Sequence, residues 1–208
     1  DLRAGPADAP TVVMIHGWTC RRAYWTPQFE HLVGRYPLLA LDLPGHGESP
    51  RPDAPRTIET AAEDVAAAID ASVEGPAILM GHSMGGAVAL ETARSLTPDR
   101  LQGVILADTF VIDYGGLDRD TQRAIAAPFE ADFRNAIADL LENTSTDATP
   151  ASLKEKLKLE MGAADTESAL PLWESLLGWS PDNAFGEIRA PIHAINGSLI
   201  PDSARERC

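Results

Sequence analysis

Short, almost continuous runs of apolar residues alternate with segments of helical period along this chain. Continuous hydrophobicity, rather than strict alternation, indicates strands buried on both faces, as in a parallel sheet covered by helices. The runs that predict strands are residues 11–16, 36–42, 77–80, 104–107 and 192–196. The segments that predict crossover helices are residues 24–33, 60–71 and 85–96, the second opening on the capping-box pattern Thr60-Ala-Ala-Glu63. This alternation predicts an α/β fold, a mostly parallel sheet with helices on both faces.

The alternation of predicted strands and helices stops at residues 110–186, which contain helical patterns and no clear strand. The helical patterns cover residues 121–141, 151–161 and 167–177. A structureless loop of this length inside a compact domain would be improbable, so we expect a helical lid inserted between two strands. The core would then comprise residues 1–109 and 187–208. We expect most apolar side chains of the insertion to pack internally, and a few, Trp173 among them, to roof an apolar pocket.

Composition and charge narrow the classes of protein that this chain can represent. With 208 residues, 44% of them hydrophobic, it can bury the core of one domain. A net charge of −14 argues against nucleic-acid binding, and no stretch of about 20 apolar residues predicts a membrane span. The first residues do not resemble a secretory signal. Two cysteines, Cys20 and Cys208, provide no disulfide framework and favour a reducing, cytoplasmic location.

The most informative motif is Gly81-His82-Ser83-Met84-Gly85, a G-x-S-x-G pattern between a predicted strand and a predicted helix. The turn would be too tight for a side chain at either glycine, and it would hold the Ser83 hydroxyl above the sheet. The N-terminus of the following helix favours negative charge at the same place. The alternative is an ordinary glycine-rich turn in which Ser83 caps the helix.

A second motif ends the strand at residues 11–16 and continues as Gly17-Trp18. A serine acyl transferase or hydrolase needs two backbone N–H groups that face the developing oxyanion, one from the residue after the nucleophile. Met84 and Trp18 occupy the two expected places. We also expect the side chains of Trp18 and Trp173 to contact substrate. His16 ends a buried strand, so we interpret it as a structural histidine.

A third motif, Asp42-Leu-Pro-Gly-His46-Gly-Glu-Ser49, follows another predicted strand. Its proline and glycines predict a tight turn in which Asp42 accepts backbone N–H groups. His46 and Ser49 could be mistaken for a catalytic pair, but their place in such a turn favours a role in the scaffold.

Taken in this order and spacing, the three motifs resemble the α/β-hydrolase superfamily, in particular its lid-bearing branch of serine esterases, lactonases and carbon–carbon-bond hydrolases. The resemblance is strong over residues 11–109 and weak over residues 192–197. It implies a small-molecule acyl substrate, no metal or organic cofactor, and a triad in the chain order nucleophile, acid, histidine. Serine rather than aspartate at the elbow argues against the haloalkane dehalogenase and epoxide hydrolase branches.

The implied triad is incomplete in these residues. After Ser83 the sequence holds one histidine, His193, inside a predicted buried strand, where a core histidine is expected. The family's commonest acid position, three residues after Gly197, is occupied by Ile200. The resemblance implies a second place for the acid, directly after the strand at residues 104–107, which is Asp108, our preferred candidate, although it could instead cap the following turn. Asp202, two residues beyond Ile200, is the other candidate. Family members usually have strands before residue 11 and a histidine-bearing loop after the last strand. We expect either a sequence truncated at both ends or a protein that has lost its base.

These motifs together predict a serine hydrolase that cleaves a carboxylic ester or related acyl substrate through an acyl-enzyme on Ser83. Two alternatives stay open. One is a non-catalytic protein of the same fold that binds a small apolar ligand, which the missing base favours. The other is a cofactor-free perhydrolase. Cys20 is the fallback nucleophile, although a small buried thiol is its more typical role. The sequence leaves open whether the protein forms a homo-oligomer.

Overall fold

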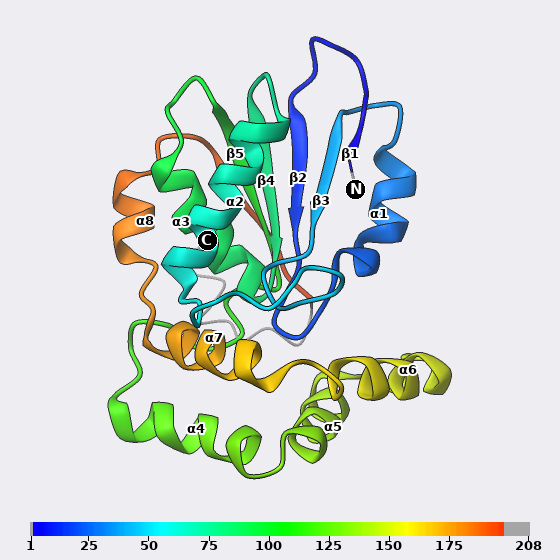
Figure 1. Ribbon diagram of the computed structural model, residues 1–208, viewed down its shortest axis with the longest axis vertical. Helices are drawn as coiled ribbons and strands as arrows, with labels where there is room; N and C mark the ends of the chain where they lie inside the picture. Colours follow the sequence, from blue (N-terminus) through cyan, green and yellow to red (C-terminus); the bar gives the residue numbers. More distant parts are fainter. Residues whose placement is uncertain (1, 198–208) are drawn as a thin grey trace.

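A twisted, mostly parallel sheet forms the centre of the molecule in this computed structural model, which describes residues 2–197 (Figure 1). Within these residues the strand order is β1-β3-β2-β4-β5-β6, and all neighbours are parallel except β1 and β3. The strands are β1 (Leu2–Arg3), β2 (Thr11–Ile15), β3 (Leu38–Leu41), β4 (Ala77–His82), β5 (Leu101–Ala107) and β6 (Ile192–Ile195). The predicted fold class is confirmed, and all five predicted strands are present.

The shortest strand, β1, contradicts the expectation that no opening strand precedes residue 11. Leu2 and Arg3 pair antiparallel with Leu39 and Leu38 of β3. The intervening segment turns back, with the Ala9 N–H donating to the Pro6 carbonyl oxygen. Two residues are enough for an antiparallel pair at the edge of a sheet, and so short a strand leaves no hydrophobic pattern in the sequence.

Helices cover both faces of the sheet, as predicted. On one face α2 (Ile58–Ser72) packs against α3 (Met84–Ser95), and α8 (Asp182–Glu187) lies beside α3. On the other face lie the 3₁₀ helix η1 (Arg22–Trp25) and α1 (Thr26–Leu32), which cover part of β2 and β3. The sequence pattern missed α8, which is too short to show a period.

The start of α2 differs from the predicted capping box. The N-cap is Thr57, whose hydroxyl accepts the Thr60 N–H, while the Thr60 hydroxyl accepts the Thr57 N–H. The helix therefore begins at Ile58, and the predicted pairing of Thr60 with Glu63 is wrong. Thr60 serves as the third helical residue of a box that starts one turn earlier.

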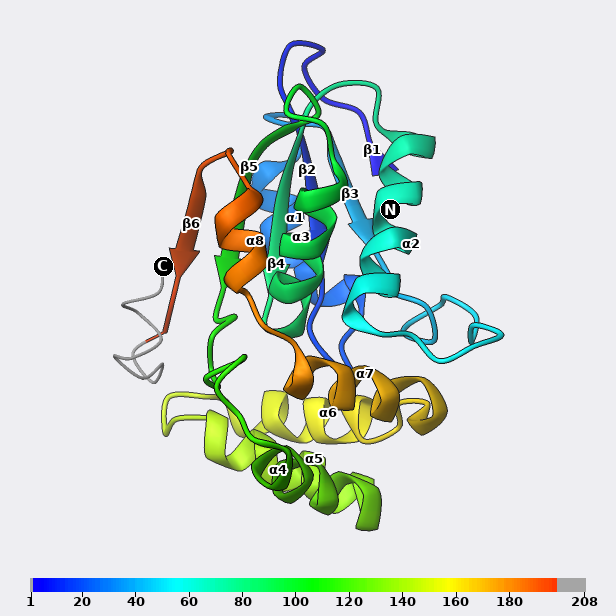
Figure 2. The same cartoon turned by 90° about the vertical axis from the view of Figure 1, so that its left-hand side faces the viewer.

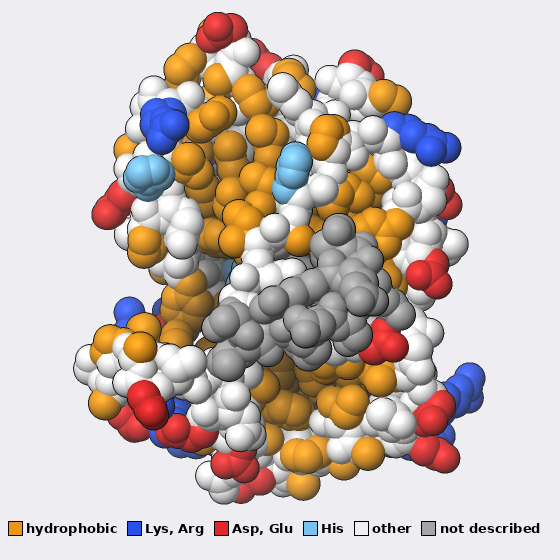
Figure 3. All heavy atoms as spheres, turned by 180° about the vertical axis from the view of Figure 1, so that it is seen from behind, with side chains coloured by type: hydrophobic (Ala, Val, Ile, Leu, Met, Phe, Trp, Pro, Cys, Tyr) orange, Lys and Arg blue, Asp and Glu red, His pale blue; other side chains and the backbone are white. Residues whose placement is uncertain are grey.

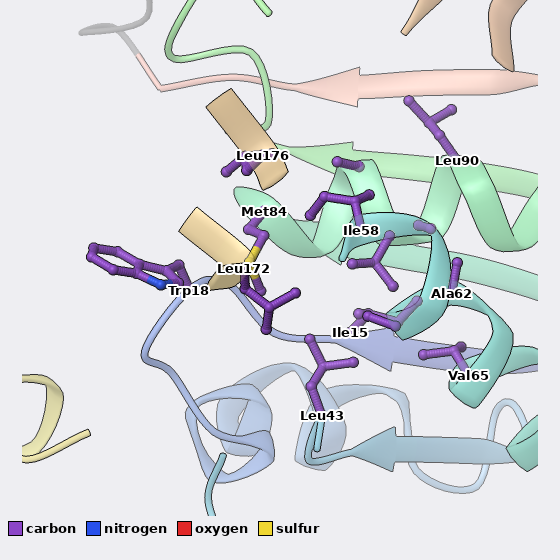
Figure 4. Close-up of a cluster of buried hydrophobic side chains, with 14 of the residues drawn as sticks. Ile15, Trp18, Leu43, Ile58, Ala62, Val65, Met84, Leu90, Leu172 and Leu176 are labelled. Carbon is purple, nitrogen blue, oxygen red and sulfur yellow. The ribbon is translucent and has the colours of Figure 1, made fainter. Parts of the chain in front are cut away.

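Four helices form a layer across the carboxyl ends of the strands (Figures 1 and 2). They are α4 (Arg119–Ala131), α5 (Phe133–Thr144), α6 (Ala151–Met161) and α7 (Thr166–Gly178). We refer to them as the helical layer. The predicted single helix at residues 121–141 is two helices, because Asp132 leaves helical geometry and its side chain accepts the Asn135 N–H that opens α5. The layer shares the main core, where Leu172 and Leu176 of α7 lie beside Met84 (Figure 4).

The sheet face that carries α1 is covered unevenly. One row of paired residues crosses this face in the order Ala40, Met14, Met80, Ile105 and His193. Ala40 and Met14 are buried, Met80 and Ile105 are half-buried, and His193 is exposed. His193 is therefore not the core histidine that its apolar neighbours predicted, because α1 reaches only the β2–β3 side. Figure 3 shows apolar side chains gathered on this side of the molecule.

No helix within residues 2–197 is both long and apolar enough to cross a bilayer.

Candidate active site

Ser83 occupies the sharp junction between β4 and α3. Its φ of 51° and ψ of −124° lie in a region that non-glycine residues rarely adopt. Two backbone hydrogen bonds hold it: the Ser83 N–H donates to the Ala107 carbonyl at 2.9 Å, and the Gly86 N–H donates to the Ser83 carbonyl at 2.8 Å. The Ser83 hydroxyl forms no capping hydrogen bond with α3. Ser83 thus occupies the N-cap position of α3, but its side chain does not cap the helix as the alternative interpretation of the motif requires.

The glycines around Ser83 are required by close contacts. A Cβ atom on Gly81 would lie 2.2 Å from the Gly85 carbonyl oxygen, and one on Gly85 would lie 2.4 Å from the Ile15 carbonyl oxygen. A Cβ atom on Gly17 would lie 3.3 Å from the Ser83 Cβ. The loop after β2 therefore packs directly against the β4–α3 junction.

The loop after β2 makes a tight turn at Trp18. The Cys20 N–H donates to the Gly17 carbonyl at 3.1 Å, and Thr19 has a φ of 58°. Within residues 2–197 no acceptor is found for the backbone N–H of Trp18 or of Met84, the first residue of α3. These two backbone donors, one in the loop after β2 and one at the start of α3, therefore lie close to Ser83 and have no acceptor in the described part of the chain.

The indole of Trp18 links this loop to the helical layer. Its Nε1–H donates to the Ala169 carbonyl of α7 at 2.7 Å. The ring stacks on Trp173 with centroids 4.6 Å apart, and it meets Phe129 of α4 edge-on at 4.9 Å and Phe133 of α5 at 5.7 Å. The structure thus brings together the two tryptophans that the sequence suggested as substrate contacts. We call these four residues the aromatic cluster.

His16 has the structural role that its position predicted. Its Nε2 accepts the Leu43 N–H at 3.0 Å, which leaves the proton on Nδ1 to be donated to the Gly17 carbonyl at 2.8 Å. Burial lowers the pKa of His16 to about 4, so the ring is neutral at physiological pH. His16 ties the loop after β2 to the loop after β3.

Asp42 organises the loop after β3, also as predicted. Its carboxylate accepts the backbone N–H groups of Arg22 and of Glu48, and it pairs with the Arg22 guanidinium. The Ser49 hydroxyl donates to the Asp42 carbonyl, and the buried His46 ring contacts the Pro44 carbonyl through Nδ1. His46 and Ser49 therefore belong to the scaffold of the turn.

Asp108 lies one residue beyond β5, next to the Ala107 carbonyl that holds Ser83. Its φ is 46°, its N–H donates to the Ile195 carbonyl at 3.0 Å, and its carboxylate accepts the Gly197 N–H at 2.6 Å. Asp108 thus joins the ends of β5 and β6 beside the elbow. The alternative acid Asp202 lies outside the described residues, as does Cys208.

Cys20 and His82 are poorly suited to act as reactive groups. Burial raises the pKa of the Cys20 thiol to about 12, so the nucleophilic thiolate is scarce near neutral pH. Burial also lowers the pKa of His82, an effect that the charge of Asp108 opposes in part. The His82 ring meets Trp25 edge-on, toward the α1 face of the sheet.

Polar contacts join the helical layer to the core around a cavity of about 480 Å³. Glu160 of α6 accepts the Tyr24 hydroxyl at 2.8 Å and pairs with Arg21 at 3.2 Å. The cavity walls come from the loops after β2 and β3 and from the α6–α7 connection, and include Cys20, His46, Glu160 and Asp165. Within the described part of the chain, no three His, Cys, Asp or Glu side chains gather as metal ligands would.

Comparison of the sequence with models of protein families shows the family of this chain. The profile described as alpha/beta hydrolase fold matches residues 10–175, which include β2, the elbow and most of the helical layer. The chain belongs to the alpha/beta hydrolase fold family.

Two relatives of this hydrolase-fold chain carry names that refer to ester cleavage. Lipase LipV of Mycobacterium tuberculosis is 35% identical over 156 residues, which are 74% of this chain and 59% of the relative. A pimeloyl-[acyl-carrier protein] methyl ester esterase of Neisseria meningitidis is 34% identical over 150 residues, 68% of this chain and 46% of the relative. The chain thus spans about half to three fifths of the length of these relatives.

A solved structure supports the fold independently. An esterase from Exiguobacterium antarcticum superposes with a TM-score of 0.86, covering 96% of this hydrolase-fold chain and 78% of the esterase, at 20% identity. At this identity the likeness concerns the fold alone.

Sequence reasoning missed one buried polar group, Glu91 in the middle of α3. Its carboxylate accepts the Trp179 indole N–H at 2.7 Å and the Arg94 guanidinium at 2.6 Å. Trp179 lies in the insertion at residues 110–186, where we expected most apolar side chains to pack internally. The available signal was a charged residue directly after the apolar run of residues 87–90 inside a predicted helix.

Proposed function

We propose that this protein is a serine hydrolase that cleaves carboxylic esters through an acyl-enzyme on Ser83. The observation that carries the proposal is the strained Ser83, with a hydroxyl that does not cap α3, close to two backbone N–H groups that have no acceptor among residues 2–197. Strained backbone at a non-glycine residue recurs where geometry must be held for chemistry. We choose esters as the substrate class because two relatives, LipV and the methyl ester esterase, are named for ester cleavage.

In the proposed reaction the Ser83 oxygen attacks the ester carbonyl carbon and its proton passes to a base. The carbonyl oxygen becomes an oxyanion, which the N–H groups of Trp18 and Met84 would hold. Losing one such donor typically costs about 3 kcal/mol or more in the barrier. The alcohol leaves with the proton from the base, and water then releases the acid from Ser83 in the same way. The N-terminus of α3 adds to the stabilisation of negative charge.

The proposal assigns the base to a histidine outside residues 1–208, oriented by Asp108 or by Asp202. In the described geometry, none of the five histidines of this chain is placed to act as the base. His16 and His46 are held in loops, His82 packs on Trp25, and His31 and His193 are exposed on α1 and β6. Asp108 is our preferred acid because it adjoins the residue that fixes Ser83.

The helical layer would act as a lid over Ser83, with the aromatic cluster, which does not line the cavity of about 480 Å³, facing the acyl group. Its tight contacts with Trp18 tie the lid to the same loop that would supply an oxyanion donor. Such walls fit a substrate with a modest apolar part.

The test is covalent labelling of the protein, expressed from its complete coding sequence, with a fluorophosphonate probe, together with hydrolysis of a short-chain p-nitrophenyl ester. We expect labelling at Ser83 and loss of both labelling and hydrolysis in Ser83→Ala. Ser95→Ala is the control, because Ser95 ends the same helix and its hydroxyl only bonds the Thr92 carbonyl. A folded wild-type protein that neither labels nor hydrolyses would instead favour the non-catalytic binding protein.

A further inference from the structure

The buried indole N–H of Trp173 has no acceptor among the residues that the structure describes. Trp173 is 8% exposed, and within residues 2–197 no hydrogen-bond partner for its Nε1 is found. Native proteins pair the great majority of buried polar atoms, because an unpaired polar atom loses its hydrogen bonds to water without gaining one in the protein. A tryptophan can only donate, so the missing partner must be an acceptor.

The indole N–H of the neighbouring Trp18 provides a comparison, because it does have an acceptor. Trp18 stacks on Trp173, yet the Trp18 Nε1–H is satisfied by the carbonyl of Ala169, one turn before Trp173 on α7. Residues 2–197 therefore supply an acceptor for one indole of the stack and none for the other.

The surroundings of Trp173 restrict the group that could accept its hydrogen bond. Trp18 stacks on its ring and Phe129 meets it edge-on at 5.5 Å, so its described ring neighbours are aromatic. A charged acceptor would lose its hydration there without an opposite charge, whereas a neutral carbonyl or hydroxyl oxygen loses much less. The stack with Trp18 also places Trp173 beside the loop that carries a proposed oxyanion donor.

We propose that the Trp173 indole N–H binds an uncharged acceptor oxygen in the acyl chain of the substrate. This inference rests on the proposed function, since it takes the aromatic cluster as the acyl site. The two backbone N–H groups at Trp18 and Met84 hold the scissile carbonyl, and Trp173 holds a second oxygen further along the chain. The preferred substrates are therefore esters of oxo- or hydroxy-substituted acids rather than of plain alkanoic acids.

Equilibrium binding to Ser83→Ala tests this without depending on turnover. The ligands are methyl octanoate and a series of its oxo derivatives with the ketone at carbon 4, 5, 6 or 7. We expect the best oxo ester to bind about five- to tenfold more tightly than methyl octanoate, the gain of one neutral hydrogen bond. Adding Trp173→Phe, which keeps an aromatic ring and removes the N–H, should abolish that preference.

Trp25→Phe is the matched control. Trp25 is also 8% exposed with an unpaired Nε1, but it packs on the α1 face of the sheet, away from the helical layer. This variant should keep the preference. The inference is overturned if every oxo ester binds no better than methyl octanoate, or if Trp173→Phe retains the preference. Failure of the proposed function shows separately, as the absence of fluorophosphonate labelling at Ser83.

A second measurement covers the case in which Trp173→Phe does not fold. The chain has 4 tryptophans, so its indole ¹H–¹⁵N resonances are few and can be assigned. The Trp173 resonance should move downfield when an oxo ester binds to Ser83→Ala and not when methyl octanoate binds. Equal shifts with both ligands would count against the inference.

Discussion

Backbone strain in this protein is concentrated at the carboxyl edge of the sheet. Among the described non-glycine residues, positive φ occurs at Thr19, Ser83 and Asp108, which follow β2, β4 and β5. Each such residue costs of order 1–3 kcal/mol. The strain at Ser83 was predictable because glycines on both sides announce a tight turn. The strain at Thr19 and Asp108 was not, because the turn at Thr19 carries no comparable glycine pattern and Asp108 is held by a hydrogen bond to Ile195 of the distant strand β6.

The close approach of α3 to β2 predicts a sharp difference between two glycine substitutions. Gly85→Ala would place a Cβ atom 2.4 Å from the Ile15 carbonyl oxygen, so we expect it to destabilise the fold by several kcal/mol. Gly186→Ala, inside α8 with open space around its Cβ position, should stabilise by about 0.5–1 kcal/mol. Urea unfolding of both variants measures this difference. Equal effects would mean that the α3–β2 contact is looser than described.

The buried histidines predict that stability falls on mild acidification. The folded protein protonates His16 only near pH 4, whereas the unfolded chain protonates it near pH 6.5. Between these values the unfolded state binds more protons, so the free energy of unfolding falls as pH drops. For His16 alone the loss from pH 7 to pH 5 is about 2 kcal/mol. Burial lowers the pKa of His46 and His82 as well, which adds to the loss.

Urea unfolding at pH 7 and pH 5 measures this loss, and variants assign it. His16→Gln should show a smaller drop between the two pH values, whereas His31→Gln, exposed on α1, should show the wild-type drop. An unchanged drop in His16→Gln would assign the pH dependence to other groups.

At the scale of single elements, the sequence predicted those helices and strands whose own residues show a clear hydrophobic pattern. The strands β2 to β6 are apolar enough to be found from sequence, and α3 follows directly from the elbow. The elements that escaped, β1 and α8, are short and depend on neighbours: β1 on pairing with β3, and α8 on packing against α3. The break at Asp132 escaped because apolar residues continue at helical spacing on both sides of it.

The contact between α3 and the end of α7 predicts which of two glutamates matters for stability. Glu91→Ala removes the acceptor of the buried Trp179 N–H and a partner of Arg94, so we expect a loss of about 2–3 kcal/mol. Glu187→Ala removes the other partner of Arg94, but this pair is exposed, and the loss should stay below about 1 kcal/mol. Urea unfolding compares the two. Similar losses would show that the Trp179 bond adds nothing beyond the ion pair.

At the scale of the molecule, the site is assembled from segments that lie far apart in the sequence. Trp18, Ser83 and Asp108 could be proposed from sequence because parallel strands end at one edge of the sheet. The acceptor of the Trp18 indole could not, since it is a backbone carbonyl of α7, which leaves no trace in residue types. The same holds for the exposure of His193, which depends on how far α1 extends across the sheet.

The uneven cover of the sheet by helices leads to a prediction about the surface of the described residues, 2–197. The half-buried Met80 and Ile105 continue at the sheet edge into Ile195, which is 62% exposed, so this face offers a connected apolar surface. Such a surface binds a dye like 8-anilinonaphthalene-1-sulfonate, whereas a single exposed apolar side chain does not. Ile195→Thr should therefore reduce dye fluorescence clearly, while Leu153→Thr, 43% exposed on α6, should leave it unchanged. Both positions are accessible enough that neither variant should shift the urea midpoint much, which separates a surface effect from unfolding. Equal reductions would place the dye elsewhere and show that this face of the sheet is covered in solution.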